Sequence, residues 1–156
     1  MYEEIGDQVD LPLTKCTKVD DHPISTRVVI MVRHGEYDKK ISPDLQKLTL
    51  KGTEQAQCTA KAIKKMPNRP TVFQVASSSL LRAKETAAII HYPLFCNARF
   101  TVDGLLNEGD LKDECTLEQF NTVHVYQNYL VVPMPGHAKT EVVVCHGNII
   151  RYFIAR

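Results

Sequence analysis

Short apolar runs, separated by stretches with helical periodicity, constrain the fold of this chain more than any other feature. The β-branched run at 28–32 predicts a strand buried on both faces of a sheet. Residues 71–76, 100–102 and 141–145 predict three further short strands. None of these runs approaches the roughly 20 apolar residues that a membrane-spanning helix requires, so no membrane segment is expected in this chain.

Helical segments lie between these predicted strands. Thr49 is a suitable N-cap for a helix with apolar residues at a 3.6-residue period, and Pro67 ends that helix. The same periodicity predicts helices over 79–90, 117–130 and 149–154. Strands that alternate with helices indicate an α/β fold, with three layers (α/β/α) around a mainly parallel central sheet.

The length of 156 residues corresponds to one domain. Residues 1–26 are polar and aperiodic and are interpreted as an N-terminal arm, so the domain is expected over 27–156. Nineteen Lys and Arg against eighteen Asp and Glu give a net charge of +1, which indicates no broad basic surface and no nucleic-acid partner.

The five cysteines are odd in number and contain no C-x-x-C pair, which fits neither a disulfide framework nor a zinc site. Free thiols indicate a reducing, intracellular compartment. The first ten residues are acidic and lack a hydrophobic stretch, so no secretory or transit peptide is expected there.

Polar residues whose side chains could take part in catalysis or bind an anion follow each predicted strand. Arg33 and His34 follow the first strand, and Arg82 lies in the first turn of the helix after the second. Glu108 follows the third strand, and His146 follows the fourth. Because the carboxyl ends of parallel strands meet at one edge of a sheet, these two histidines, two arginines and one carboxylate are expected to converge.

Phosphoryl transfer is the chemistry that needs such a set. Guanidinium groups match the oxygens of a phosphomonoester bidentately. One neutral histidine can attack phosphorus, and nearby arginine charges lower its pKa and favour the neutral form. A second histidine can donate to the phosphoryl oxygens, and a carboxylic acid can protonate the leaving alkoxide. This chemistry needs no cofactor and no metal, and no ligand spacing suggests a metal.

At these positions the sequence resembles the histidine phosphatase superfamily, also called the phosphoglycerate-mutase-like family. The resemblance rests on four segments in the family's order, at 33–36, 48–56, 77–87 and 145–148. It implies a phosphomonoester hydrolase that works through a phosphohistidine intermediate.

The resemblance also implies a role for each site residue. His34 would be the phosphorylated nucleophile, while Arg33, Arg82 and His146 would bind the phosphate. Glu108 would be the acid that protonates the leaving group and then the base that activates water.

Within the superfamily, Tyr37 and the stretches at 105–109 and 145–152 look like the branch of mitochondrial serine/threonine-protein phosphatases. That branch implies a phosphoserine or phosphothreonine protein as substrate and a mitochondrial location. A small-molecule phosphatase or a phosphoglycerate mutase remains an alternative. Mutases usually carry a Ser and then a Trp-Asn pair after the first motif, whereas this chain has Tyr37 and no Trp, which favours hydrolysis.

Two other functions remain open. Cys145 and Arg151 have the C-x5-R spacing of cysteine-dependent phosphatases, although Asn148 stands where those enzymes usually carry glycine. A catalytically weak relative that binds phosphorylated ligands as a scaffold would also carry many of these residues.

The chain ends ten residues after His146, whereas members of the family usually continue into further strands. We therefore expect a domain that is short at its C-terminal edge. A sheet edge without those strands exposes backbone groups and favours association into a homo-oligomer.

Overall fold

The computed structural model of this chain describes residues 26–67, 71–108, 128 and 138–154. Its strands are β1 (Thr26–Arg33), β2 (Val72–Ser77), β3 (Arg99–Val102) and β4 (Ala138–Cys145). Its helices are α1 (Leu50–Lys65), α2 (Leu81–Leu94) and α4 (Gly147–Ile154), with short 3-10 helices η1 (Pro43–Leu45) and η2 (Gly104–Leu106). The predicted arm, apart from Thr26, and the predicted helix over 117–130, apart from Asn128, lie outside the described residues.

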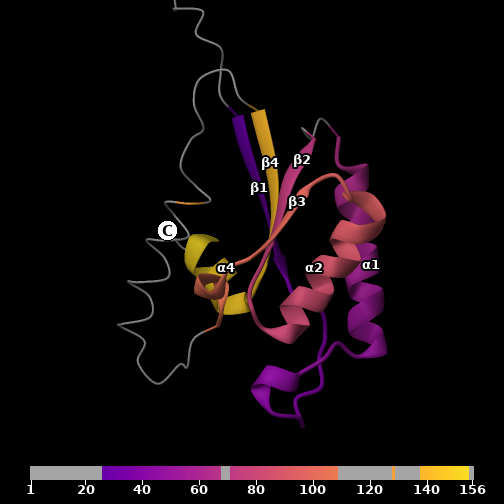
Figure 1. Ribbon diagram of the computed structural model, residues 1–156, viewed down its shortest axis with the longest axis vertical. Helices are drawn as coiled ribbons and strands as arrows, with labels where there is room; N and C mark the ends of the chain where they lie inside the picture. The colour runs from indigo at the N-terminus through magenta and orange to yellow at the C-terminus, as the bar shows by residue number, and fades with distance from the viewer. Residues whose placement is uncertain (1–25, 68–70, 109–127, 129–137, 155–156) are drawn as a thin grey trace, which may run out of the picture.

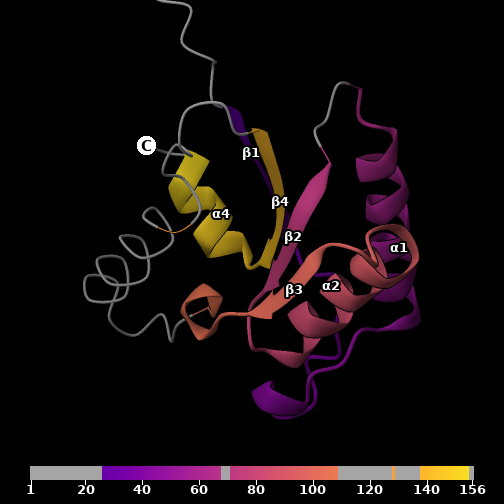
Figure 2. The same cartoon turned by 45° about the horizontal axis from the view of Figure 1, so that its top comes forward.

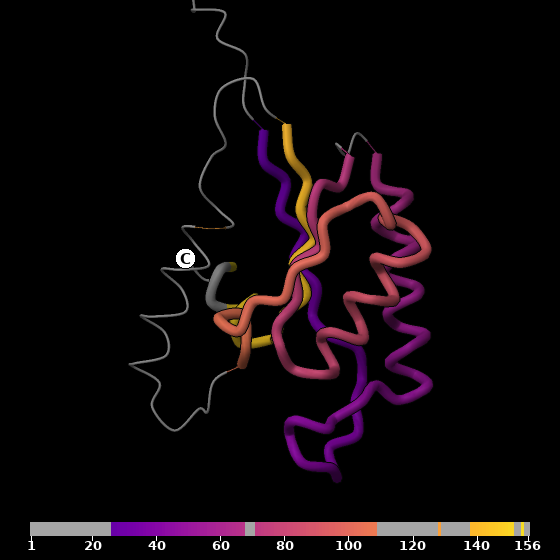
Figure 3. The backbone as a smooth tube through the Cα atoms, in the orientation of Figure 1, coloured from indigo at the N-terminus to yellow at the C-terminus, as the bar shows by residue number. Residues whose placement is uncertain are grey.

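The strands form a sheet in the order β1-β4-β2-β3, and each neighbouring pair is parallel. Helices α1 and α2 cover one face of this sheet and α4 covers the other, as Figures 1 and 2 show. The predicted three-layer α/β fold with a parallel sheet is therefore confirmed for the described residues. The tube in Figure 3 shows the segment after β1 passing below the sheet to reach α1.

Strand β4 runs through the centre of the sheet and is buried on both faces. Val142 and Val144 belong to the core beneath α1 and α2, while Val143 and Cys145 belong to the core beneath α4. All four side chains are fully buried. A strand covered on both sides needs apolar residues at successive positions, which explains why the sequence of β4 does not alternate.

Strand β1 differs from its prediction. Its position is correct, but among its residues only Val32 is buried and most of the others are half-buried. The reason is that β1 lies at an edge of the described sheet, where β4 pairs with it on one side only. The β-branched composition that suits a central strand suits this edge position as well.

Helix α1 begins as predicted. The side chain of Thr49 accepts a hydrogen bond of 3.0 Å from the backbone N–H of Gly52, as an N-cap does. Three of the predicted apolar positions, Ala56, Ala60 and Ile63, are buried. The fourth, Met66, is exposed because the helix ends at Lys65 and Met66 is its C-cap.

Helix α2 begins two residues later than predicted and extends to Leu94. Ser78 and Ser79 do not join the helix, because their hydroxyl groups bond to the side chain of Asn107. Of the four residues that periodicity predicts on one buried stripe, Ala83, Ala87 and Ile90 are buried, whereas Leu80 is the half-buried N-cap of the helix.

Two glycines allow the end of β1 to cross the start of α1 at close range. A Cβ atom on Gly35 would overlap the carbonyl oxygen of Gly52, and a Cβ on Gly52 would overlap the carbonyl oxygen of Glu36. The backbone N–H of Thr49 donates to that same Glu36 oxygen at 2.9 Å. The crossing therefore fixes the segment that carries His34 against the first turn of α1.

We expect Gly52→Ala to lower the free energy of unfolding by about 1–3 kcal/mol, because the new methyl group would overlap the backbone of Glu36, which cannot move away. The control is Gly104→Ala, where a Cβ would meet no atom of the described residues within 4 Å. That change should stay within about 0.5 kcal/mol. Urea unfolding of both variants measures the difference, and equal stabilities would contradict the proposed crossing.

Candidate active site

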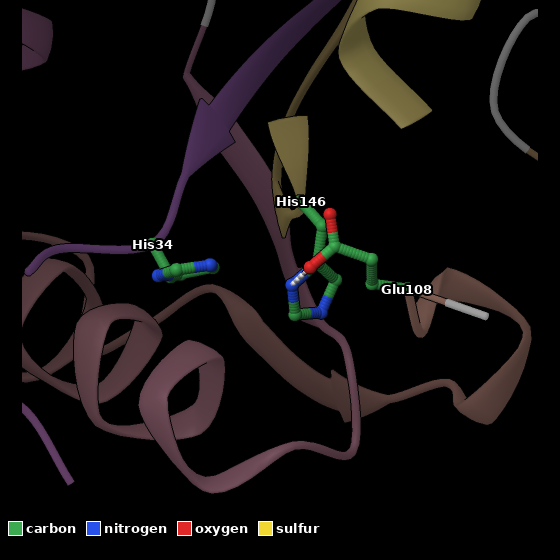
Figure 4. Close-up of side chains that lie close together, drawn as sticks. All are labelled: His34, Glu108 and His146. Carbon is green, nitrogen blue, oxygen red and sulfur yellow. Dashed lines mark ion pairs between the residues drawn. The ribbon is translucent and has the colours of Figure 1, made fainter. Parts of the chain in front are cut away.

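The structure brings together the polar residues that follow the strands. His34 lies directly after β1, His146 joins β4 to α4, and Glu108 follows η2. Figure 4 shows these three side chains directed toward one another from separate elements. The centroids of the two histidine rings lie 5.0 Å apart. Arg82, in the first turn of α2, places its Nη2 atom 3.6 Å from Oε2 of Glu108.

His34 is buried, and its two ring nitrogens have different environments. Nδ1 lies 2.9 Å from the carbonyl oxygen of Gly35, and because a carbonyl only accepts, Nδ1 carries the proton. Nε2 therefore has a free lone pair, toward which Arg82 Nε is directed at 3.4 Å. Burial lowers the pKa of His34, and the charges of Arg82 and Arg33 lower it further against the Gly35 hydrogen bond. The ring is neutral near pH 7.

Arg82 is buried and held from three sides. Its Nη1 donates to Gln46 Oε1 at 3.1 Å, its guanidinium carbon lies 4.6 Å from the centre of the Tyr37 ring, and Nη2 faces Glu108. Tyr37 also packs edge-on against His34. The sequence marked Tyr37 only as a branch feature and gave no signal for Gln46, which lies 36 positions from Arg82.

His146 is fully buried. Its Nε2 lies 2.8 Å from Ser78 Oγ, whereas Nδ1 lacks a hydrogen-bond partner within the described part of the chain. A carboxylate oxygen of Glu108 lies 3.6 Å from Nδ1. Burial, which is the largest cause, together with His34, Arg82 and Arg33 lowers the pKa of His146 to about 3. This histidine is also neutral near pH 7.

Arg33 approaches from the end of β1. Its side chain lies over the backbone of Gly147, so close that a Cβ there would come within 3.4 Å of Arg33 Nε. Its charge contributes to the lowered pKa of both histidines. Four of the five residues that the sequence singled out are therefore in contact, and the fifth, the exposed Arg33, is near enough for its charge to affect both histidines.

An amide side chain that the sequence did not single out joins two loops of the site. Asn107 Oδ1 accepts from the backbone N–H of Ser79 at 2.9 Å and from Ser78 Oγ at 2.7 Å. Its Nδ2 donates to Ser79 Oγ at 2.8 Å. These bonds anchor the loop that carries Glu108 to the loop between β2 and α2. The sequence marked Asn107 only as part of the branch-like stretch at 105–109 and gave no sign of its contacts.

His34, Glu108 and His146 each offer one atom within 4.8 Å of the others, a spacing at which a metal ion can bind. Two guanidinium groups, however, lie beside the same space and repel a cation. Cationic side chains around neutral histidines favour an anion there, and a phosphoryl group carries the matching charge and acceptor oxygens.

Cys145 lacks the environment of a nucleophilic thiol. Its side chain is packed in the core beneath α4, and burial raises its pKa to about 12. A reactive cysteine needs a lowered pKa, because only the thiolate attacks. Arg151, its expected partner in a cysteine-dependent site, is exposed on α4. These observations oppose the thiolate mechanism.

Comparison with known sequences identifies the family. Residues 29–129 match the sequence model of the histidine phosphatase superfamily, branch 1. This chain belongs to the histidine phosphatase superfamily. The resemblance deduced from the four segments is thereby confirmed.

A curated relative, the mitochondrial serine/threonine-protein phosphatase Pgam5 of Drosophila willistoni, is 29% identical over 87% of this chain. The match covers 52% of the relative, so the chain spans about half the length of the curated proteins it matches. The predicted similarity to this branch is therefore confirmed at the level of sequence. Among the described residues, no helix is long and apolar enough to cross a membrane.

Solved structures have the same fold. A phosphoglycerate mutase from Plasmodium falciparum matches with a TM-score of 0.65 and 33% identity, over 85% of this chain and 69% of that one. The protein histidine phosphatase SixA, in complex with tungstate, matches with a TM-score of 0.54 and 19% identity, over 81% of this chain and 74% of that one. The second match supports the fold alone.

The lowered pKa of His146 predicts how stability depends on pH. Between the unfolded value near 6.5 and the folded value of about 3, the unfolded chain binds more protons. Stability should therefore fall as the pH drops below about 6.5. His146→Gln should flatten this slope between about pH 6.5 and 4, measured by urea unfolding. An unchanged slope would contradict the buried neutral state of His146.

Proposed function

We propose that this chain is a phosphomonoester hydrolase that forms a phosphohistidine intermediate on His34. The observation that supports this proposal most strongly is the unprotonated Nε2 of His34, which lies beside the buried guanidinium group of Arg82. A neutral nucleophile next to fixed cations is what attack on an anionic phosphoryl group requires.

In this proposal Arg33, Arg82 and His146 bind the phosphoryl group. Arg82 already lies against His34, so little reorganisation of its guanidinium is needed when the anion binds, and the exposed Arg33 is near enough for its charge to lower the pKa of both histidines. Each charge-assisted hydrogen bond to a phosphoryl oxygen contributes about 1.5–3 kcal/mol, a tenfold to hundredfold effect on affinity or rate. Gln46 and Tyr37 would keep the Arg82 guanidinium in place.

The reaction then has two steps. In the first, the lone pair of His34 Nε2 forms a bond to phosphorus, the ester P–O bond breaks, and the carboxylic acid of Glu108 gives its proton to the leaving oxygen. In the second, the Glu108 carboxylate takes a proton from water as the water oxygen attacks phosphorus. The N–P bond breaks, which releases phosphate and restores neutral His34.

Glu108 is positioned for this exchange of protons. Its side chain is 29% exposed, whereas those of Arg82 and His146 are almost fully buried. The carboxyl group of Glu108 is therefore more accessible to solvent than Arg82 or His146, on the side from which the attacking water would arrive and to which the leaving alcohol would depart.

For the substrate we propose a phosphoserine or phosphothreonine protein. The name of these relatives, serine/threonine-protein phosphatase, supports this class. The 33% identity to a phosphoglycerate mutase supports a small phosphorylated metabolite as the alternative. Turnover rates on a panel of phosphopeptides and small phosphomonoesters separate the two. Turnover of metabolites without any turnover of phosphopeptides would overturn the protein-phosphatase proposal.

The names of the same relatives support a mitochondrial location. We propose this location, and the association into a homo-oligomer expected from the sequence, for the protein in its cell.

The test of the reaction is hydrolysis of an aryl phosphate by the wild-type chain, His34→Ala and Cys145→Ser, each checked for cooperative unfolding. We expect turnover by the wild type and by Cys145→Ser, and a loss of at least about a thousandfold in His34→Ala, because the nucleophile is absent. The opposite pattern would assign the reaction to the thiol. A folded but inert wild type would favour the phosphate-binding scaffold.

Glu108→Gln tests the proton donor. An aryl oxide leaves without much help, whereas an alkoxide needs a proton, so the variant should lose activity on alkyl phosphates at least about tenfold more than on aryl phosphates. The matched control is Glu54→Gln on the exposed face of α1, which should change neither rate. Equal losses on both substrates would remove Glu108 from this role.

A further inference from the structure

The hydroxyl group of Ser78 has a complete set of hydrogen-bond partners. Its oxygen lies 2.7 Å from Asn107 Oδ1, 2.8 Å from His146 Nε2 and 3.2 Å from the backbone nitrogen of Leu80. A hydroxyl has one proton to donate and two lone pairs to accept with, so three partners use all of its capacity. The direction of each bond can therefore be deduced.

The orientation of the Asn107 amide starts the deduction. The backbone N–H of Ser79 points at the amide atom 2.9 Å away, and because a backbone N–H only donates, that atom is the oxygen. Ser78 lies against the same oxygen, which can only accept. The hydroxyl group of Ser78 must therefore donate its single hydrogen bond to Asn107 Oδ1, since two oxygens 2.7 Å apart without a proton between them would repel each other.

This arrangement fixes the proton of His146. Ser78 Oγ, which already donates to Asn107, can only accept from His146, so Nε2 of His146 carries the ring proton. In the neutral ring Nδ1 is then an unprotonated acceptor. It is fully buried, lacks a hydrogen-bond partner among the described residues, and faces the space shared with His34 and Glu108.

We propose that Asn107 is a positioning residue that acts through Ser78 to hold the proton of His146 on Nε2, so that the bare Nδ1 receives the proton of a bound phosphomonoester monoanion. This inference rests on the proposed function, because it assigns a step in phosphate binding to that same site. It also changes the role expected for His146, which can donate to the phosphoryl group only after it has accepted a proton from it.

The proton balance is simple. The P–O–H group of the monoanion gives its proton to Nδ1, the phosphoryl group becomes a dianion, and His146 becomes an imidazolium that donates to a phosphoryl oxygen. The phosphate product takes the proton back when it leaves as a monoanion. A phosphomonoester loses its second proton near pH 6, so the preferred ionic form becomes scarce above that pH.

Titratable and charged groups surround His146 from several elements. Arg33 and His34 face it from the end of β1, Arg82 faces it from α2, and Glu108 faces it from the segment after η2. Cys145, its neighbour on β4, is held protonated by burial. Arg33, Arg82 and His34 oppose a positive charge on His146 until an anion arrives, which links proton uptake to phosphate binding.

The first test reads the protonated nitrogen directly, by NMR of the chain with ¹⁵N-labelled histidine rings. In the free wild type we expect the proton of His146 on Nε2, and addition of inorganic phosphate should protonate Nδ1 as well. Asn107→Leu should move much of the proton to Nδ1 in the free chain, because Ser78 then donates to Nε2. Asn107→Asp keeps the acceptor oxygen and should retain the wild-type state. The control is Asn97→Leu, at an exposed position.

A proton on Nδ1 in the free wild type, or an unchanged state in folded Asn107→Leu, would overturn the proposal. The NMR measurement of the protonated nitrogen does not require the chain to be catalytically active. If the NMR result is as expected and the chain is inert, the positioning role stands and the proposed hydrolase function fails.

The second test uses kcat/KM for an aryl phosphate as a function of pH. Asn107→Leu should lose about tenfold or more near pH 5, where the monoanion dominates, and clearly less near pH 8. The reason is that a proton already on Nδ1 suits the dianion instead. A loss of the same size at every pH would show that Asn107 merely supports the loop, and it would overturn the proposal.

Discussion

The pairing of β4 with β1 on one side and β2 on the other determines where every group of the site lies. Two backbone hydrogen bonds extend this pairing past the ends of β1 and β2. The N–H of His34 donates to the carbonyl oxygen of Cys145 at 3.1 Å, and the N–H of Ser78 donates to the carbonyl oxygen of Val144 at 3.0 Å. His34 and Ser78 are thereby placed on either side of His146, the next residue after β4. The buried, doubly covered β4 makes this arrangement rigid.

Much of this arrangement could be predicted because its signals are local. An apolar run followed directly by His-Gly places a histidine at the end of a strand, and parallel strands bring such ends together. Thr49 as an N-cap and the small residues of α1 and α2 are likewise visible within a single helical turn or stripe. These features needed no knowledge of the partner across the sheet.

The features that could not be predicted depend on contacts between distant segments. The edge position of β1 is set by which strand pairs with it, and composition does not record that choice. Asn107 meets Ser79 across 28 positions, and Gln46 meets Arg82 across 36. Each is an ordinary polar residue in a loop, and only the folded structure gives it a partner.

The site keeps groups in states that folding alone would not favour. Within the described residues, the buried Nδ1 of His146 has no hydrogen-bond partner, which costs about 1–3 kcal/mol, and the guanidinium of Arg82 is buried with the carboxylate of Glu108 3.6 Å away. A bound phosphoryl group would satisfy both. Local rules of stability are typically broken where a protein works, and here both exceptions lie beside Glu108.

The central claim is that a phosphoryl group passes through Nε2 of His34. The most direct measurement is to quench the chain during turnover of a phosphomonoester and to locate the phosphoryl group by mass spectrometry and ³¹P NMR. The account predicts an acid-labile phosphohistidine at His34, with phosphorus on Nε2 and not on the Nδ1 that donates to Gly35. A phosphoryl group on Cys145, on Nδ1 of His34, or on no residue of an active chain would contradict it.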